Sequence, residues 1–589
     1  MKRKDFLKKS MALGGALWFG PSMAHVNLPF FGLTTQDLKK RLIQGNDDHV
    51  RALLSQGDAA NRHGNRSLGY NFAKFAASYC QPESTYFHQT ILVEKLSETV
   101  ERLFAILRPD GTINAGNLES PPDTAFIMEP LCSGVYILLQ DKQPALDPVK
   151  KSIQSFIEKV GQALTTGGVH TPNHRWEICS ALAWVNALYP NPKYVQRIDE
   201  WLSEGIYIDE DGHYPERSMN YADVENRAFL TIGRHLKRPE LFKPVAKSLE
   251  MTYYYMEPNG DLVTFDSRRQ DQYSFKTIMG QYLHYRYLAI TQKNPTFSAI
   301  ASLIEKQTDF ESQIVNESLF HFMANSALFD PLPTPKTPST QFTKVFKTSS
   351  LARIRRDDTT VTIFGGNDWP LIIASGRSVS PNFFAYRRGD AILKYMRMSS
   401  RFFSMGFFRS EGLNVQGNTY TLHKKLEAPY YQPLPAKLRN SKGDYELTPS
   451  TDDRFWSKMA FDKRPQSNVK TLDSRVEIKE TNGEVSLDFH VTGQEGVEVT
   501  IHLCFDEKGT LEGVKSARGA DQDYFLEDGY GIFRQGKDQI TFGPGIKKHE
   551  FIRGLEGEKY SVHFGNLRTP GHHVYLTGVT PFHYTLKFS

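Results

Sequence analysis

The chain of 589 residues is longer than one hydrophobic core ordinarily supports, and its composition (39% hydrophobic, 23% charged) is that of a globular protein, so roughly two or three domains are expected. Its formal net charge of +5 is concentrated at the N-terminus, because the first 24 residues hold five of the 71 basic side chains and one of the 66 acidic ones. The nearly neutral remainder argues against a nucleic-acid partner, which requires a surplus of basic side chains.

The first 24 residues are typical of an export signal. Basic residues at positions 2–9 precede a short apolar run, Met11–Gly20, and the small residues Ser22 and Ala24 stand where a signal peptidase inspects the chain. The apolar run is too short to span a bilayer as a helix. The segment 3–8 resembles a twin-arginine signal with lysine in place of the second arginine, so the export route stays open. The sequence therefore predicts an exported protein, periplasmic or secreted, without a membrane span.

The segment 25–329 is predicted to be helical. Apolar residues recur at spacings of three and four over 92–107, 153–164 and 181–188, as they do on the buried face of a helix. About ten to twelve such segments are joined by loops rich in Gly, Pro and Asp. Helices paired at this spacing build an (α/α) toroid. We therefore expect the catalytic domain to be an incomplete (α/α) toroid.

A proline-rich linker over 330–342 is predicted to end the helical domain. Four prolines fall within 330–339, where they prevent a helix and favour an extended chain. Beyond the linker, 343–589 is predicted to form an antiparallel β-sheet domain resembling a β-sandwich. The fold class is thus α+β and multidomain, and the order of helices before strands argues against a doubly wound fold. Side chains alternate with the period of a strand over 360–364, 476–479, 485–491, 497–503, 575–577 and 583–588.

Neither a cofactor nor a metal site is expected. The four cysteines (Cys80, Cys132, Cys179 and Cys504) are far apart in the sequence and form no CxxC pair. Three of them lie in helical patterns, where burial without a partner is the commoner state.

The first group of candidate site residues opens a predicted helix after Pro172. Asn173 and His174 fall at or near the helix N-terminus, where backbone N–H groups favour an anionic ligand such as a carboxylate. Glu177 follows His174 by three residues and could orient its imidazole ring. The same residues also suit a structural role, with Asn173 as N-cap and Glu177 as the acid of a capping box.

The second group is a long polar loop, 207–221. Asp211 and Gly212 mark a turn, and Pro215 prevents a regular helix or strand through the middle. Polar loops on a helical scaffold often carry binding sites, although tyrosines there can also seal helix ends. The candidate side chains of this loop are His213, Tyr214, Glu216, Arg217, Ser218, Asn220 and Tyr221.

Asp123 is a third candidate. It follows Pro121 and Pro122 directly before a long apolar helix, so a role as helix N-cap and a role in lining the substrate site are both open. Two runs of basic and aromatic residues, 273–286 and 397–409, could hold an anionic sugar or belong to the core.

The order of these motifs resembles a known family. An Asn-His pair opens a helix, a Glu follows three residues later, and Tyr221 of the DG-Y-E-S-Y loop comes 47 positions after His174. Together with helices before strands over nearly the whole chain after the signal, this resembles the heparinase II/III and alginate-lyase superfamily of polysaccharide lyases. A rhamnose–glucuronate lyase is one specificity that the resemblance allows. It also implies a histidine from the β domain, for which His423 is the candidate, unless that residue only faces solvent from a strand.

The resemblance implies β-elimination at a uronate, which yields a 4,5-unsaturated product. Asn173, together with Arg217, would bind the uronate carboxylate and stabilise the enolate-like state. Either His174 or Tyr221 would remove the C5 proton, and Tyr221 would protonate the leaving oxygen. A tyrosine base needs a nearby cation to favour its phenolate, for which Arg217 is a candidate. Additional substrate contacts are expected from Glu177, Tyr214, Asp123 and His423.

Two other functions stay open. A glycoside hydrolase on an (α/α) toroid would need a pair of carboxylic acids, for which Glu177, Asp123, Asp211 and Glu216 are candidates. A glycan-binding protein without catalytic activity is the other alternative. For either reading the expected partner is an acidic polysaccharide or oligosaccharide. The nearly neutral chain favours a glycan that is not densely sulfated, such as alginate, ulvan or one with rhamnose–glucuronate ends.

Overall fold

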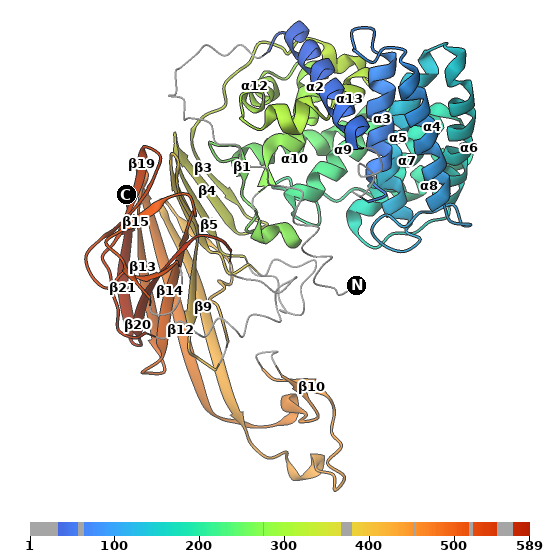
Figure 1. The fold of residues 1–589 in the computed structure, drawn as a ribbon. Coiled ribbons are helices and arrows are strands. Elements are labelled where there is room, and N and C mark those ends of the chain that lie inside the picture. Colours follow the sequence, from blue (N-terminus) through green and yellow to red (C-terminus); the bar gives the residue numbers. More distant parts are fainter. Residues whose placement is uncertain are drawn as a thin grey trace.

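The computed structural model describes residues 33–56, 64–274, 276–366, 380–403, 405–451, 455–517, 522–550 and 569–589. The predicted export signal, 1–24, lies outside these residues. The described chain forms a helical domain followed by a domain of strands, as Figure 1 shows. This confirms the predicted fold class, an α+β multidomain protein with an N-terminal (α/α) toroid and a C-terminal β-sheet domain.

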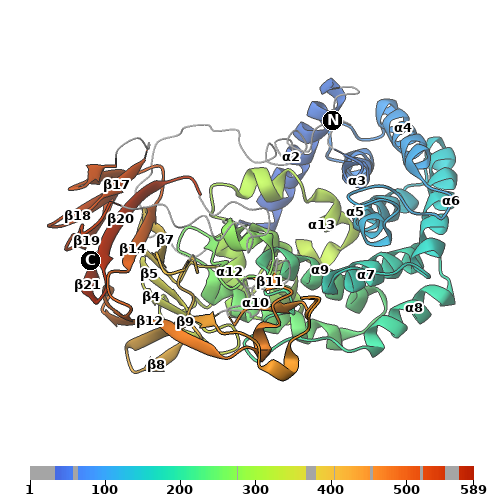
Figure 2. The same ribbon diagram turned by 90° about the horizontal axis from the view of Figure 1, so that it is seen from below.

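The helical domain is an open ring of helices. Neighbouring helices α3, α5, α7 and α9 pack in chain order, and α13 closes against α3 and α5. Figure 2 shows the ring from below. The helices are α2 (Thr35–Gln56), α3 (Ser67–Cys80), α4 (Thr90–Ile106), α5 (Pro121–Gln140), α6 (Asp147–Leu164), α7 (Pro172–Leu188), α8 (Pro192–Ser203), α9 (Met219–His235), α10 (Phe242–Tyr255), α11 (Tyr282–Thr291), α12 (Pro295–Ile304) and α13 (Leu319–Ala324).

Several helices begin at a capping side chain, often followed by proline in the first turn. The Ser120 hydroxyl accepts a hydrogen bond from the Asp123 N–H at the start of α5, and Asn191 caps α8 in the same way. Such caps satisfy backbone donors that have no partner within the helix. Ser120 is therefore the N-cap of α5, and the capping role predicted for Asp123 is wrong. The Asp123 carboxylate is instead bound by Arg66 and Asn117.

The strand domain consists of two large sheets and a small antiparallel pair, β10 (Thr448–Pro449) with β11 (Trp456–Ser457). The larger sheet has the order β16-β17-β20-β14-β7-β6-β5-β4-β3, and the smaller has the order β15-β18-β19-β21-β13-β12-β9-β8. The strands of the larger sheet are β3 (Gln341–Phe346), β4 (Leu351–Arg356), β5 (Thr359–Phe364), β6 (Phe384–Arg388), β7 (Ala391–Ser400), β14 (Glu498–Phe505), β16 (Lys515–Ser516), β17 (Asp523–Phe525) and β20 (His572–Val579). Those of the smaller sheet are β8 (Asn414–Gln416), β9 (Thr419–Tyr431), β12 (Gln466–Thr481), β13 (Glu484–Gly493), β15 (Thr510–Glu512), β18 (Gly531–Gln535), β19 (Asp538–Gly543) and β21 (Phe582–Phe588).

The two sheets share one apolar core. Phe384 of the larger sheet and Phe588 of the smaller one have ring centroids 5.5 Å apart. Side chains alternate between buried and exposed along β13, as expected for a strand with one solvent-facing side. The six predicted strands coincide with β5, β12, β13, β14, β20 and β21. The sheets are antiparallel as predicted, except that β17 runs parallel to β20 among the described strands.

The strand domain contacts the helical domain through β3, β4 and the turn between them. The Thr348 hydroxyl donates to Asp209 at 2.7 Å, and its backbone N–H donates to Asp211 at 2.8 Å. The ring of Phe346 in β3 lies 6.0 Å from the ring of His213. The polar loop 207–221 is therefore held at the junction between the two domains.

Two further features concern the whole described chain. No helix in it is both long and apolar enough to cross a membrane. All four cysteines lie within it and are unpaired, with Cys132, Cys179 and Cys504 buried.

Candidate active site

Asn173 lies in the first turn of α7 and is fully buried. Its amide nitrogen donates to the Glu216 carboxylate at 2.6 Å and to the Thr171 hydroxyl at 3.1 Å, so both amide hydrogens have partners. Its amide oxygen is buried and accepts no hydrogen bond from the described residues. Asn173 thus ties the start of α7 to the loop that carries Glu216.

His174 follows Asn173 and is partly buried beside Phe126, whose ring centroid lies 6.3 Å away in an edge-on arrangement. Burial lowers the pKa of His174 to about 4, against the opposing charge of Asp123, and the positive charges of Arg269 and Arg66 lower it further. The imidazole is therefore neutral near pH 7. Its Nδ1 atom is buried and has no hydrogen-bond partner among the described residues.

Tyr221 lies in the first turn of α9, where its phenol oxygen accepts two hydrogen bonds. The Gln270 side-chain amide donates at 3.0 Å and the Arg269 guanidinium at 3.3 Å. The Arg269 guanidinium also lies 4.4 Å from the centroid of the Tyr221 ring. Two donors and a cation stabilise negative charge on a phenol oxygen. The arrangement therefore suits a tyrosine that exchanges its proton during a reaction.

A hydrogen-bonded chain connects the two motifs. The Arg269 guanidinium forms an ion pair with Glu216, which in turn accepts from Asn173. Asn173, Glu216, Arg269 and Tyr221 therefore form one continuous network, although 48 positions separate the first from the last in the sequence. Such connected polar networks hold their members in one arrangement.

Asp271 anchors the segment that carries Arg269 and Gln270. Its buried carboxylate accepts from the hydroxyl of Ser218, the N-cap of α9, at 2.9 Å and from the hydroxyl of Ser267. The same Ser218 hydroxyl accepts from the Tyr221 N–H at 3.2 Å. Asp271 and Ser218 thus join the segment 266–272 to the start of α9, next to Tyr221.

Three predicted substrate residues have their side chains in structural contacts. The carboxylate of Glu177 is fully buried and accepts from Arg227 at 3.0 Å, so it does not orient His174 as predicted. The hydroxyl of Tyr214 is buried and donates to Asn226 at 2.9 Å. Arg217 is buried with a φ of 47°, and its charge acts on Tyr255 at the domain junction. The cation that contacts Tyr221 is Arg269.

Asp123 and His423 occupy different parts of the molecule. Asp123 is buried, and although burial opposes ionisation, hydrogen bonds from Ser120 and Asn117 and the charge of Arg66 lower its pKa. Its charge acts on His174, so it belongs to the surroundings of the site. His423 is exposed on β9 and pairs with Asp473 on the neighbouring strand at 3.1 Å. The solvent-facing alternative for His423 is the one that the structure shows.

The two basic and aromatic runs differ in their surroundings. Arg397 is buried, and its guanidinium lies 3.9 Å from the centroid of the Tyr395 ring within the strand domain. In the other run, His284 pairs with Asp223 at 2.8 Å, and Arg286 is buried against Glu305. Arg286 and Arg397 are therefore core residues. No group of three or more His, Cys, Asp or Glu side chains in the described chain is placed to hold a metal ion.

Arg66, Arg269 and Gln270 were missed by the sequence analysis. Arg66 lies before α3, where its guanidinium is 4.6 Å from the centroid of the Phe126 ring. Arg269 and Gln270 belong to the run Asp266–Gln272, which is as dense in polar groups as the loop 207–221. That density was the available signal, since polar loops on a helical scaffold often carry sites.

Comparisons with known proteins identify the fold. No family model and no curated protein sequence matches the chain. Among solved structures, the chain is similar to heparinase III, with 11% identity over 88% of this chain and 76% of that one and a TM-score of 0.51. It is similar to a chondroitin AC lyase of Streptomyces coelicolor, with 12% identity over 93% and 79% and a TM-score of 0.50. It is also similar to a Paenibacillus xanthan lyase, with 10% identity over 94% and 57% and a TM-score of 0.54.

At these identities the comparisons show a shared fold. The fold of this chain is that of the α/α-toroid polysaccharide lyases.

Proposed function

We propose that the protein is a polysaccharide lyase that cleaves a uronate-containing glycan by β-elimination. The observation that carries this proposal is the phenol oxygen of Tyr221, which accepts from Arg269 and Gln270 at the end of a network that reaches Asn173. The fold shared with heparinase III and chondroitin AC lyase supports it. The reaction needs a group that takes one proton and returns another, and a tyrosine held by a cation suits that task.

A side chain of the site can be assigned to each proton transfer of the elimination. A base removes the C5 proton, a double bond forms between C4 and C5, and the C4–O bond breaks with its electron pair on the leaving oxygen. We assign the base to the Tyr221 phenolate, which then returns the proton to the leaving oxygen. His174, whose pKa is about 4, is a weak base near neutral pH and instead serves as a neutral hydrogen-bonding partner.

The uronate carboxylate must be neutralised for the C5 proton to leave. Arg66 and Arg269 both lie near enough to His174 to lower its pKa, although each is also paired with a carboxylate, Arg66 with Asp123 and Arg269 with Glu216. The predicted contact of Asn173 with the carboxylate requires its amide to leave Glu216 or Thr171. We therefore propose that the arginines supply the charge and that Asn173 acts as a positioning residue through Glu216.

A glycoside hydrolase would need two carboxylic acids facing the substrate. The candidate acids are all engaged within the protein: Glu177 by Arg227, Asp123 by Arg66, Glu216 by Arg269 and Asp211 by Thr348. This observation favours elimination over hydrolysis. The nearly neutral composition further favours a substrate that is not densely sulfated, and the leader at 1–24 supports export to the periplasm or beyond.

The test is to incubate the purified protein with uronate polysaccharides such as alginate, ulvan and an arabinogalactan with rhamnose–glucuronate ends. We expect products that absorb in the near ultraviolet, as 4,5-unsaturated uronates do. Tyr221→Phe removes the proton that is exchanged and should lower kcat at least about 100-fold, and His174→Ala should have an effect of similar size. The matched control is Tyr207→Phe, which alters a tyrosine of the same loop that is 61% exposed. Saturated reducing ends as the sole products, or a fully active Tyr221→Phe variant, would contradict the proposal.

A further inference from the structure

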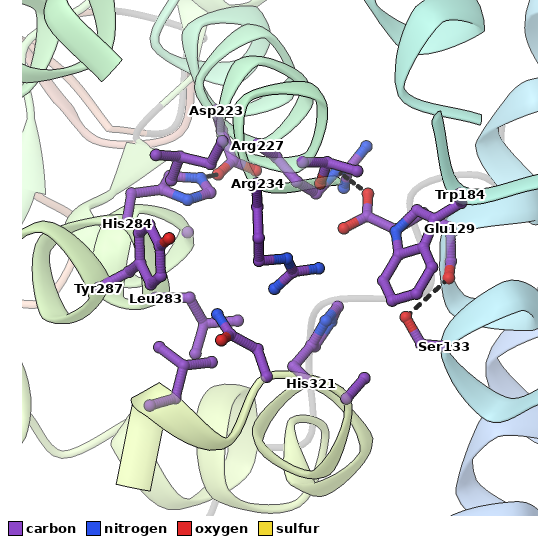
Figure 3. A pocket seen from close by; sticks show the side chains of 16 residues that line it. Glu129, Ser133, Trp184, Asp223, Arg227, Arg234, Leu283, His284, Tyr287 and His321 are labelled. Carbon is purple, nitrogen blue, oxygen red and sulfur yellow. Dashed lines mark hydrogen bonds and ion pairs between the residues drawn. The ribbon is translucent and has the colours of Figure 1, made fainter. Parts of the chain in front are cut away.

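The inner helices of the toroid enclose a cavity of about 180 Å³ that contains none of the proposed catalytic residues. It lies between α5, α7, α9, α11 and α13, and Figure 3 shows the side chains that point into it. Tyr221 is in the first turn of α9 and Arg234 in its last turn, 13 positions later. That separation corresponds to about 20 Å along the helix axis. Arg234 therefore lies far from the site at the helix N-termini, although Asp223, two positions after Tyr221, also lines the cavity.

Two arginines on the same face of α9 have opposite surroundings. Arg227 lies between Glu129, at 2.5 Å, and Glu177, at 3.0 Å, and these charges outweigh burial and raise its pKa well above the usual value. Arg234, two helical turns later, has no carboxylate partner among the described residues. Its guanidinium contacts the His235 ring nitrogen at 3.1 Å, and burial lowers the pKa of Arg234. The charge of Glu129 acts on Arg234 from farther away, but no carboxylate among the described residues forms an ion pair with it.

The Arg234 guanidinium occupies the middle of the cavity in Figure 3, with Trp184 to one side and His321 below. Its central carbon lies 5.3 Å from the centroid of the Trp184 ring. The indole N–H of Trp184 is buried and has no hydrogen-bond partner in the described part of the chain. Burial lowers the pKa of His321 to about 3, so that ring is neutral. A buried donor without a partner is costly and indicates a group that a ligand would satisfy.

The acids that line the cavity are already engaged. Asp223 pairs with His284 at 2.8 Å, and Glu129 pairs with Arg227. Burial raises the pKa of Glu129, and the charge of Arg227 opposes that rise, so the Glu129 carboxylate is committed to Arg227. The groups left for a ligand are therefore mainly donors, namely the Arg234 guanidinium and the Trp184 N–H. A guanidinium fork binds a carboxylate well, and the ring of Tyr287 suits a sugar ring, whereas the Trp184 ring already packs against Arg234 and His235.

We propose that this cavity binds the carboxylate of a small sugar acid, held by the Arg234 guanidinium and the Trp184 indole N–H. Its volume equals that of about six water molecules, at roughly 30 Å³ each, which suits a ligand no larger than about one sugar unit. The evidence that the cavity binds an anion comes from Arg234 and Trp184 alone. The choice of a uronic acid as the ligand rests on the proposed function, because the proposed substrate carries such acids.

The test is isothermal titration calorimetry of the whole protein with sodium glucuronate, with glucose and inorganic phosphate as comparisons. We expect glucuronate to bind with one site per chain, glucose not to bind and phosphate to bind at least tenfold more weakly. Arg234→Gln should weaken glucuronate binding at least tenfold. Arg238→Gln, which alters a nearby arginine paired with Asp199 at the surface, should leave binding unchanged. If Arg234→Gln does not fold, Trp184→Phe, which removes the N–H and keeps an aromatic ring, should weaken binding severalfold.

The same titration separates this site from the active site. Tyr221→Phe should bind glucuronate as the unaltered protein does. Loss of binding in Tyr221→Phe with retention in Arg234→Gln would place the ligand in the active site and overturn the proposal. Equal affinity for phosphate and glucuronate, or no binding of either, would also overturn it. Absence of unsaturated products from polysaccharides would count against the proposed lyase reaction without affecting this result.

Discussion

The charge state of His174 is governed by its neighbours as well as by its burial. Burial lowers its pKa to about 4, and Arg269, His170 and Arg66 act in the same direction, whereas Asp123 opposes them. The ring is therefore neutral at every pH well above 4. A neutral imidazole has one nitrogen that accepts a hydrogen bond and one N–H that donates one.

This charge state predicts the contribution of His174 to the pH profile, which is separate from that of the Tyr221 phenolate. If His174 must be neutral, its protonation should reduce kcat/KM only as the pH falls toward 4. Arg66→Gln removes a positive charge, so the pKa of His174 should rise and this acid limb of the profile should move to higher pH. Arg102→Gln on α4 is the matched control and should leave the limb in place. A limb that stays at the same pH in the Arg66 variant would show that another group controls it.

At the scale of elements, the site depends on how the loop after α10 is anchored to the start of α9. Asp271 accepts from Ser218 and Ser267 and so holds Arg269 and Gln270 at the phenol oxygen of Tyr221. Asp271 is therefore a positioning residue, whose loss should change the turnover of bound substrate more than its binding.

Asp271→Ala tests this role. The variant leaves the buried hydroxyls of Ser218 and Ser267 without their acceptor, which should lower the free energy of unfolding by about 1–3 kcal/mol. We expect kcat to fall by at least about tenfold with a smaller change in KM, because a misplaced catalytic group affects mainly the reaction step. Asp309→Ala, at an exposed position, is the control. Equal losses in kcat and in affinity would indicate a general disturbance of the site instead.

The helices and strands were easier to predict from the sequence than the long-range contacts between their side chains. The start of α7 after Pro172 and six strands follow from local patterns, because capping, proline geometry and side-chain alternation act over a few residues. The contact of Arg269 with Tyr221 joins positions 48 apart, and that of Arg66 with Asp123 joins positions 57 apart. Such contacts depend on how helices pack in the ring. For that reason Asp123 resembled an N-cap in the sequence, although Arg66 binds its carboxylate and Ser120 caps the helix.

At the scale of the whole molecule, the two domains are joined by a buried charge cluster around Glu257. This residue follows α10, and its carboxylate lies 3.0 Å from the guanidinium of Arg353 in β4 and 3.8 Å from that of Arg387 in β6. The Thr360 hydroxyl of β5 also donates to it. The side chains of Glu257 and Arg353 are 3% and 0% exposed. Water therefore cannot stabilise either charge when the other residue is removed.

Glu257→Gln therefore should destabilise the protein strongly. Removing one partner of a buried ion pair leaves the other charge uncompensated, which costs about 3–5 kcal/mol. Glu498→Gln breaks an exposed pair with Arg401 and should cost at most about 1 kcal/mol. The measurement is urea unfolding of both variants beside the unaltered protein. Similar midpoints for the two variants would show that the Glu257 cluster contributes no more than a surface pair.

The same cluster should make the junction between the domains sensitive to acid. Burial alone would raise the pKa of Glu257, but the charges of Arg353 and Arg387 outweigh it and hold the pKa below its usual value of 4.5. A carboxyl whose pKa is lower in the folded state stabilises that state fully above 4.5, and this stabilisation is lost as the pH falls through the lowered value. The unaltered protein should therefore lose stability below about pH 4.5, whereas Glu257→Gln, already destabilised, should lose less over the same range. Unfolding curves measured from pH 7 to pH 3 compare the two slopes, and equal slopes would show that other carboxyl groups control the acid sensitivity.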